Sequence, residues 1–178
     1  YLDKIFVTSD PKIIPSYYRY KFCFIPYPVH KKIDFLRSYS QKRKKYDVFF
    51  ALSHGQNRAV LKKGRVDERE KLIKKIKYHL NKVNISTLFV GLNNIEPRWG
   101  MDFYRTLLDS KITLNISRGK YKELYSSDRI ASLSGNGCFI LNENSNRYSK
   151  LFSNQEIVHF KNVNDLIKKI KFFLKNDK

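Results

Sequence analysis

Cysteine, glycine and acidic residues are all scarce in this chain of 178 residues. The two cysteines, Cys23 and Cys138, lie in apolar runs, so they indicate no disulfide framework and favour a reducing, cytoplasmic compartment. No stretch approaches the roughly 18 uninterrupted apolar residues of a membrane span. Histidine and cysteine never cluster at the spacing of metal ligands, so we expect no metal site.

Short catalytic motifs are missing as well. The chain contains neither a Gly-x-Ser-x-Gly elbow nor a Walker loop. Gly135-Asn136-Gly137 follows a predicted helix instead of opening one, so it is not a dinucleotide-binding fingerprint.

Positive charge dominates the composition. The chain has 36 lysines and arginines against 16 acidic residues, a net charge of +20. This balance indicates a polyanionic partner such as nucleic acid, an anionic membrane surface or a phosphorylated ligand. AT-rich coding would also enrich lysine without selection for binding. Lysines spread over every helix would favour that second explanation, whereas a stripe through residues 37–45 and the last helix would favour a binding surface.

From residue 47 onward, apolar runs alternate with amphipathic segments. The pattern predicts strands at 47–53, 87–92, 111–117, 138–141 and 156–160, and helices at 69–83, 101–110, from 128, and at 164–174. Alternation of this kind is typical of βαβ units with right-handed crossovers. The predicted fold is therefore α/β, a Rossmann-like parallel sheet with helices on both faces.

The first 46 residues follow a different pattern. Two short strands are predicted at 4–8 and 22–25, and Pro26 and Pro28 then prevent further central pairing. The basic run at 41–45 is interpreted as a solvated linker or helix face.

Three loops should meet at the carboxyl edge of the predicted sheet, where α/β proteins bind ligands. The first contains Gly55, Arg58 and Lys63, which could hold a diphosphate or form a basic surface loop. The second contains Trp99, which could pack on a base or sugar or be buried against the following helix.

The third loop carries Arg118 and Lys120 and leads to a helix that begins near Asp128. Ser127 is a candidate cap for this helix, and Arg129 adds a fixed charge to its positive end. We therefore expect a phosphate group to bind here.

Two motifs and the chain ending resemble a known family. Trp99-Gly100 with Phe103-Tyr104, and Asp128-Arg129 followed by Gly137-Cys138-Phe139-Ile140-Leu141, are similar to the central motifs of group 1 glycosyltransferases related to spore maturation proteins. The closing pattern at 151–174 is similar too, and the resemblance runs from about Asp47 to Asp177.

This resemblance implies the carboxyl-terminal half of a GT-B glycosyltransferase, an enzyme built from two Rossmann-like domains. Residues 1–46 would be the end of the acceptor domain with the interdomain segment, and residues 47–178 the nucleotide-sugar-binding domain. The implied reaction is metal-independent hexosyl transfer from a nucleotide-diphosphate sugar to a glycan, lipid or protein. The sugar nucleotide is a co-substrate and no further cofactor is implied. Catalytic residues are unassigned, since they would lie in the acceptor half.

The resemblance also assigns individual positions. Arg129 matches the arginine at the helix start, and Ser132 stands where relatives place a glutamate that holds the ribose hydroxyls. A serine cannot accept both hydroxyls as a carboxylate does. Two alternatives therefore stay open: a degenerate glycosyltransferase scaffold, or a non-catalytic basic module that binds nucleic acid or an anionic membrane. Peripheral contact with the inner membrane face is a further expectation from charge.

Overall fold

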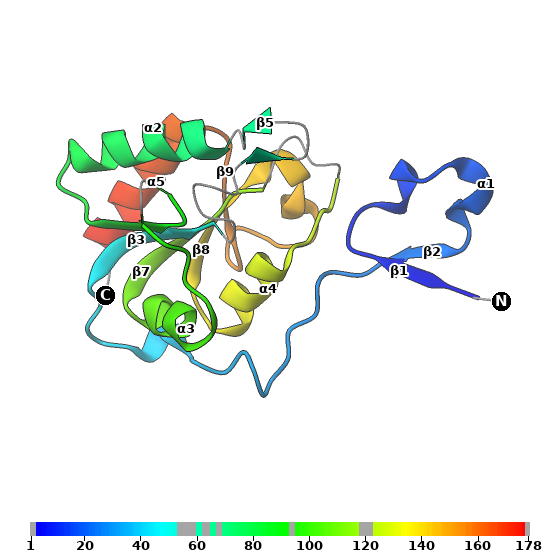
Figure 1. Cartoon of the computed structure of the whole chain (residues 1–178), viewed down its shortest axis with the longest axis horizontal. Helices are drawn as coiled ribbons and strands as arrows, with labels where there is room; N and C mark the ends of the chain where they lie inside the picture. The colour runs from blue at the N-terminus through cyan, green and yellow to red at the C-terminus, as the bar shows by residue number, and fades with distance from the viewer. Residues whose placement is uncertain are drawn as a thin grey trace.

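Five parallel strands form the central sheet of the protein, in the order β6-β3-β7-β8-β9 (Figure 1). The computed structural model describes residues 3–52, 60–61, 65–66, 69–92, 95–117 and 123–176. The strands are β3 (Tyr46–Ala51), β6 (Thr87–Val90), β7 (Ser110–Asn115), β8 (Phe139–Glu143) and β9 (Val158–Phe160). The predicted α/β fold with a parallel sheet is confirmed.

Helices cover both faces of this sheet (Figure 1). On one face lie α2 (Arg69–Asn81) and α5 (Val163–Lys175), and on the other α3 (Gly100–Leu108) and α4 (Asp128–Gly135). Apolar residues three and four positions apart form the buried stripe of each long helix, such as Ile73, Ile76 and Leu80 of α2. Two 3-10 turns, η4 (Asn144–Asn146) and η5 (Tyr148–Lys150), follow β8.

Two details of the loops differ from the sequence prediction. The strand predicted at 87–92 ends at Val90, because Gly91 adopts a φ of +77° and Leu92 pairs back with Ile95. A Cβ atom at position 91 would lie 2.2 Å from the carbonyl oxygen of Leu52, so only glycine fits. The segment after β3, predicted as a plain loop, contains a short antiparallel pair, β4 (Val60–Leu61) and β5 (Arg65–Val66).

The N-terminal residues form a small unit beside the main sheet (Figure 1). Its two predicted strands, β1 (Ile5–Val7) and β2 (Phe22–Phe24), pair in parallel. Between them lie η1 (Pro11–Ile13) and α1 (Ser16–Arg19). Backbone hydrogen bonds from Ser126 to Thr8 (2.7 Å) and from Asp10 to Glu123 (3.0 Å) join this unit to the loop before α4. The unit therefore lies near the carboxyl edge of the sheet.

Residues 26–45, here called the crossing segment, run from the N-terminal unit along α4 to β3 (Figure 1). A Cβ atom at Gly135 would lie 2.5 Å from Cγ1 of Val29, so the segment packs directly on this glycine. Next to it, the Asn136 amide donates to Oδ1 of Asp34 (3.0 Å) and accepts from the Leu36 amide (3.2 Å). The crossing segment thus packs against the Gly-Asn-Gly sequence at 135–137.

The basic run at 41–45 is only partly solvated. The ammonium of Lys44 is half-buried and donates to the Ser38 carbonyl (2.8 Å), the Ser38 hydroxyl (3.0 Å) and the Ser110 carbonyl (3.1 Å). Ser38 opens the 3-10 turn η2 (Ser38–Ser40) and donates in turn to the Leu107 carbonyl at the end of α3 (3.0 Å). The interpretation of this run as a solvated face is wrong for Lys44, which fixes the crossing segment to the sheet.

Candidate functional site

A pocket of about 500 Å³ opens at the carboxyl edge of the sheet. The end of β3, the loop before α3, the first turns of α4 and the crossing segment form its walls. The residues lining it include Tyr27, His30, Asp34, Leu52, Arg98, Trp99, Tyr104, Asp128, Arg129 and Ser132. One cavity is thus lined by three of the site residues predicted from the sequence, Trp99, Arg129 and Ser132.

Arg129 is anchored across the ends of two strands. Its Nη1 donates to the carbonyl of Ile116, just after β7, at 2.9 Å. Its guanidinium lies over the ring of Phe50 of β3, 5.3 Å from the centroid. The cation–π contact and the hydrogen bond orient a planar group whose fork of N–H donors suits phosphate oxygens. The positive charge at this edge is therefore held in one place.

The first turn of α4 carries its own hydrogen-bond acceptors. Ser127 is the N-cap, and its hydroxyl accepts from the amide of Ile130 at 3.5 Å. The Asp128 carboxylate accepts from the amide of Arg129 at 2.8 Å. Because two side chains already satisfy these amides, the Arg129 guanidinium is the stronger candidate for anion contact. The hydroxyl of the preceding residue, Ser126, accepts from the amide of Tyr27 in the crossing segment at 2.9 Å.

Trp99 faces the pocket and solvent. Its side chain is 62% exposed, which excludes burial against the following helix. The Trp99 carbonyl accepts from the amides of Asp102 (3.2 Å) and Phe103 (3.4 Å), so α3 begins directly after the indole. Gly100, at a φ of +51°, makes the turn between them. An exposed indole on a firm helix start is a surface on which a base or sugar can pack.

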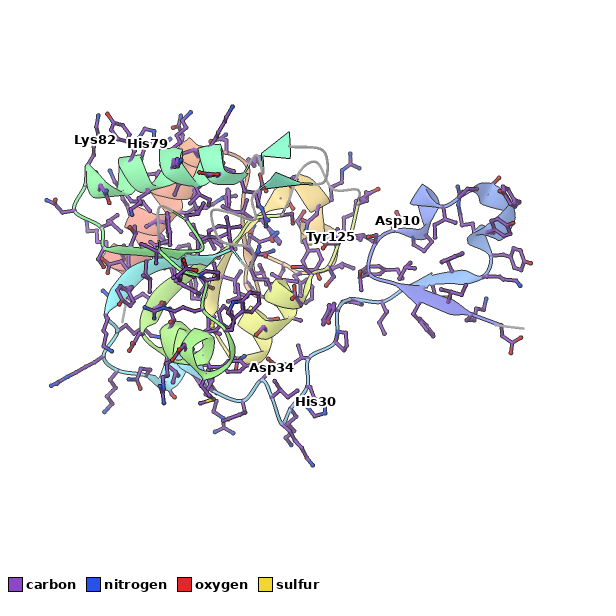
Figure 2. The ribbon with its side chains drawn as sticks, viewed as in Figure 1. Asp10, His30, Asp34, His79, Lys82 and Tyr125 are labelled. Carbon is purple, nitrogen blue, oxygen red and sulfur yellow. The ribbon has the colours of Figure 1, made fainter. Side chains whose placement is uncertain are left out.

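Sequence reasoning missed several residues of the pocket. Arg98 adds a second guanidinium, held by a hydrogen bond of 2.6 Å from its Nη1 to the Thr106 hydroxyl. His30 and Asp34 come from the crossing segment below α4 (Figure 2). The position of Arg98 beside Trp99 could have indicated it. Only the fold brings residues 30 and 34 to a helix a hundred positions later.

A further carboxyl group lies at the same edge, outside the lining of the pocket. Burial raises the pKa of Glu143 at the end of β8 above its ordinary value, and hydrogen bonds from Ser145 and Ser117 and the charge of Arg69 offset only part of that rise. Arg69 is itself buried at the start of α2. The charge of Arg69 thus favours the ionised form of Glu143.

The remaining predicted site residues, Gly55, Arg58, Lys63, Arg118 and Lys120, lie outside the described residues. Ser132 is half-buried on α4, and its backbone carbonyl accepts from the Asn136 amide side chain at 2.8 Å. The helix that carries Ser132 to the pocket, α4, therefore also packs against the crossing segment.

Comparison with known proteins identifies the family of the chain. A family model described as glycosyl transferase-like matches residues 62–178, more than half of the sequence. The chain belongs to this glycosyl transferase-like family. No curated protein and no solved structure matches it. Membership implies a transferase acting on a sugar donor and an acceptor, and the matched region includes α3, α4 and the arginines of the pocket. No helix within the described parts of this glycosyl transferase-like chain is long and apolar enough to cross a membrane.

Proposed function

We propose that the pocket binds the nucleotide-diphosphate part of a sugar donor and that the chain is the donor-binding half of a GT-B glycosyltransferase. The observation that carries this proposal is the meeting of Arg98, Trp99 and Arg129 in one cavity of about 500 Å³. Two guanidiniums suit a diphosphate, and the indole suits a base or sugar. The cavity is also large enough for a small ligand.

In this assignment the arginines act on the leaving group. When the bond between the anomeric carbon and the diphosphate oxygen breaks, its electron pair passes to the diphosphate, and fixed positive charge stabilises that product. Arg129 is oriented before the donor arrives, so no reorganisation is needed at that step. Ser132 would offer one hydrogen bond to the ribose.

The finer features of the proposal follow from the sequence resemblance. They are kinship with the spore maturation protein-like glycosyltransferases, hexosyl transfer, and assignment of residues 1–46 to the end of the acceptor domain. The other proposed phosphate ligands, Arg58, Lys63, Arg118 and Lys120, lie outside the described residues. A glycan, lipid or protein acceptor would be held by the other half of the enzyme.

Calorimetric titration with UDP, GDP, CDP and ADP tests the proposal. We expect one nucleotide to bind, and the Arg129→Ala variant to lose at least about tenfold in affinity, because a charge-assisted contact contributes about 1.5–3 kcal/mol. Arg105→Ala is the matched control, since Arg105 is an exposed arginine on α3 outside the pocket. Its affinity should equal that of the wild type.

Two results would contradict the proposal. If a folded sample binds none of the four nucleotides, the chain is better explained as a degenerate scaffold. If Arg129→Ala and Arg105→Ala bind equally well, the pocket is not where the diphosphate lies.

A further inference from the structure

Lysines are distributed very unevenly over the helices of this protein. Residues 69–82, which include α2, carry six basic side chains and one acidic one. Residues 161–175, which include α5, carry five basic side chains and one acidic one. In contrast, α3 and α4 each carry one basic and one acidic residue. Among these four helices, the excess of positive charge therefore lies on α2 and α5, whereas α3 and α4 are neutral.

The two lysine-rich helices lie side by side on the same face of the sheet (Figure 1). Each buries its apolar stripe, so its lysines lie toward solvent, as Lys82 does at the end of α2 (Figure 2). The exposed lysines of this surface, here called the α2/α5 face, are Lys71, Lys74, Lys75, Lys82, Lys161, Lys168, Lys171 and Lys175. Only Glu70 and Asp165 oppose them on these two segments, in ion pairs with Lys74 and Lys169.

The same face exposes aromatic side chains among the lysines. Phe172 of α5 is 61% exposed and Tyr78 of α2 is 57% exposed. The ammonium of Lys82 lies 4.4 Å from the centre of the Tyr78 ring. Both helices run from the carboxyl edge of the parallel sheet to its amino edge, so these two rings lie away from the pocket. Lysine charge beside exposed aromatic rings is the composition of a surface that rests on a bilayer.

We propose that the α2/α5 face docks on a membrane surface rich in anionic lipids. Lysine is the only exposed cation of these two segments, because Arg69 is buried. A strongly hydrated ammonium on a long stem suits a diffuse layer of lipid headgroups, whereas nucleic-acid recognition favours the planar fork of arginine. The pocket lies at the carboxyl edge beside α3 and α4, so docking through α2 and α5 leaves it open.

Sedimentation of the full chain with lipid vesicles tests the proposal. We expect binding to vesicles of equimolar phosphatidylglycerol and phosphatidylcholine, weakening as NaCl is raised, and no binding to phosphatidylcholine alone. The variant Lys71→Gln, Lys75→Gln, Lys168→Gln, Lys171→Gln should lower the partition coefficient by about a thousandfold. Phe172→Ser should weaken binding without changing its dependence on salt, because it removes apolar contact and no charge.

A second variant with the same net charge is the control. It carries Lys12→Gln, Lys31→Gln, Lys32→Gln and Lys42→Gln, all exposed lysines outside the α2/α5 face. Its vesicle binding should stay within about twofold of the wild type, since the charges near the bilayer are unchanged. Equal loss in both variants, or no binding to anionic vesicles, would overturn the proposal. So would tighter binding to duplex DNA than to vesicles, lost in the α2/α5 variant.

Discussion

Asp47 shows how one side chain can hold the start of the sheet together. Its Oδ2 accepts from the amide and the hydroxyl of Ser86 at 2.9 Å each, and its Oδ1 lies 3.0 Å from the ammonium of Lys111. Burial would raise the pKa of Asp47, but these hydrogen bonds and the Lys111 charge hold it below its ordinary value. The ionised carboxylate thus connects β3 to the residues that begin β6 and β7.

Asp47→Asn should lower the free energy of unfolding at pH 7 by about 1 kcal/mol, because the ion pair and part of the hydrogen bonding are lost. A depressed pKa stabilises the fold above the unfolded value of 3.8 and ceases to do so as the pH falls below it. The difference between variant and wild type should therefore shrink below pH 3.8. Urea titrations at pH 7 and at a pH below 3.8 measure this difference in the free energy of unfolding. Asp102→Asn, at an exposed carboxylate, should change neither value. A deficit that persists at low pH would contradict this account.

At the scale of elements, the end of α4 packs against the crossing segment. Gly135 and Gly137 leave room for Val29 and Tyr39, and a Cβ atom at Gly137 would lie 2.6 Å from the Tyr39 ring. Gly137 also has a φ of +67°, which other residues rarely adopt. Both glycines therefore serve the packing of the crossing segment.

Gly135→Ala should loosen the crossing segment although alanine favours helices. Helix propensity alone predicts a gain of about 1 kcal/mol, but the added methyl group would lie 2.6 Å from Cβ of Asp34. We expect faster hydrogen exchange and faster trypsin cleavage at Lys31 and Lys32, with weaker nucleotide binding because a pocket wall moves. Ser134→Ala, at an exposed position of the same helix, is the control. Unchanged hydrogen exchange in residues 29–39 would contradict the proposed packing of the crossing segment on Gly135.

Sequence patterns predicted the sheet and its helices because the apolar periods are local. They did not predict the pocket wall formed by Asp34, since its partner Asn136 lies about a hundred residues away. They also left the position of Trp99 open, because a single aromatic residue beside glycine fits both burial and exposure. Arg129 was found from its place at a helix start, but its contact with Phe50 required the strand order.

At the scale of the molecule, the net charge of +20 also affects the stability of the fold. Like charges concentrated on α2 and α5 repel one another in the folded state, and salt screens that repulsion. The folded state must therefore offset the electrostatic repulsion between the outer surfaces of α2 and α5.

The variant lacking Lys71, Lys75, Lys168 and Lys171 should melt about 2–4 °C above the wild type at low ionic strength, because self-repulsion falls. Differential scanning calorimetry in about 1 M NaCl should show that advantage disappear, since the Debye length is then only about 3 Å. The control set at 12, 31, 32 and 42 should gain less, as those lysines lie outside the crowded face. Equal gains in both variants would show that net charge alone matters.

The crossing segment also bears on how such enzymes can be recombined. Tyr27, His30 and Asp34 precede the sheet in the chain and yet line the pocket. A chimera joined at residue 46 would exchange those three side chains together with the rest of the first 45 residues, and so alter the ligand preference of the sheet although the sequence of the sheet itself was untouched. A joint placed before Tyr27 would transplant the pocket whole.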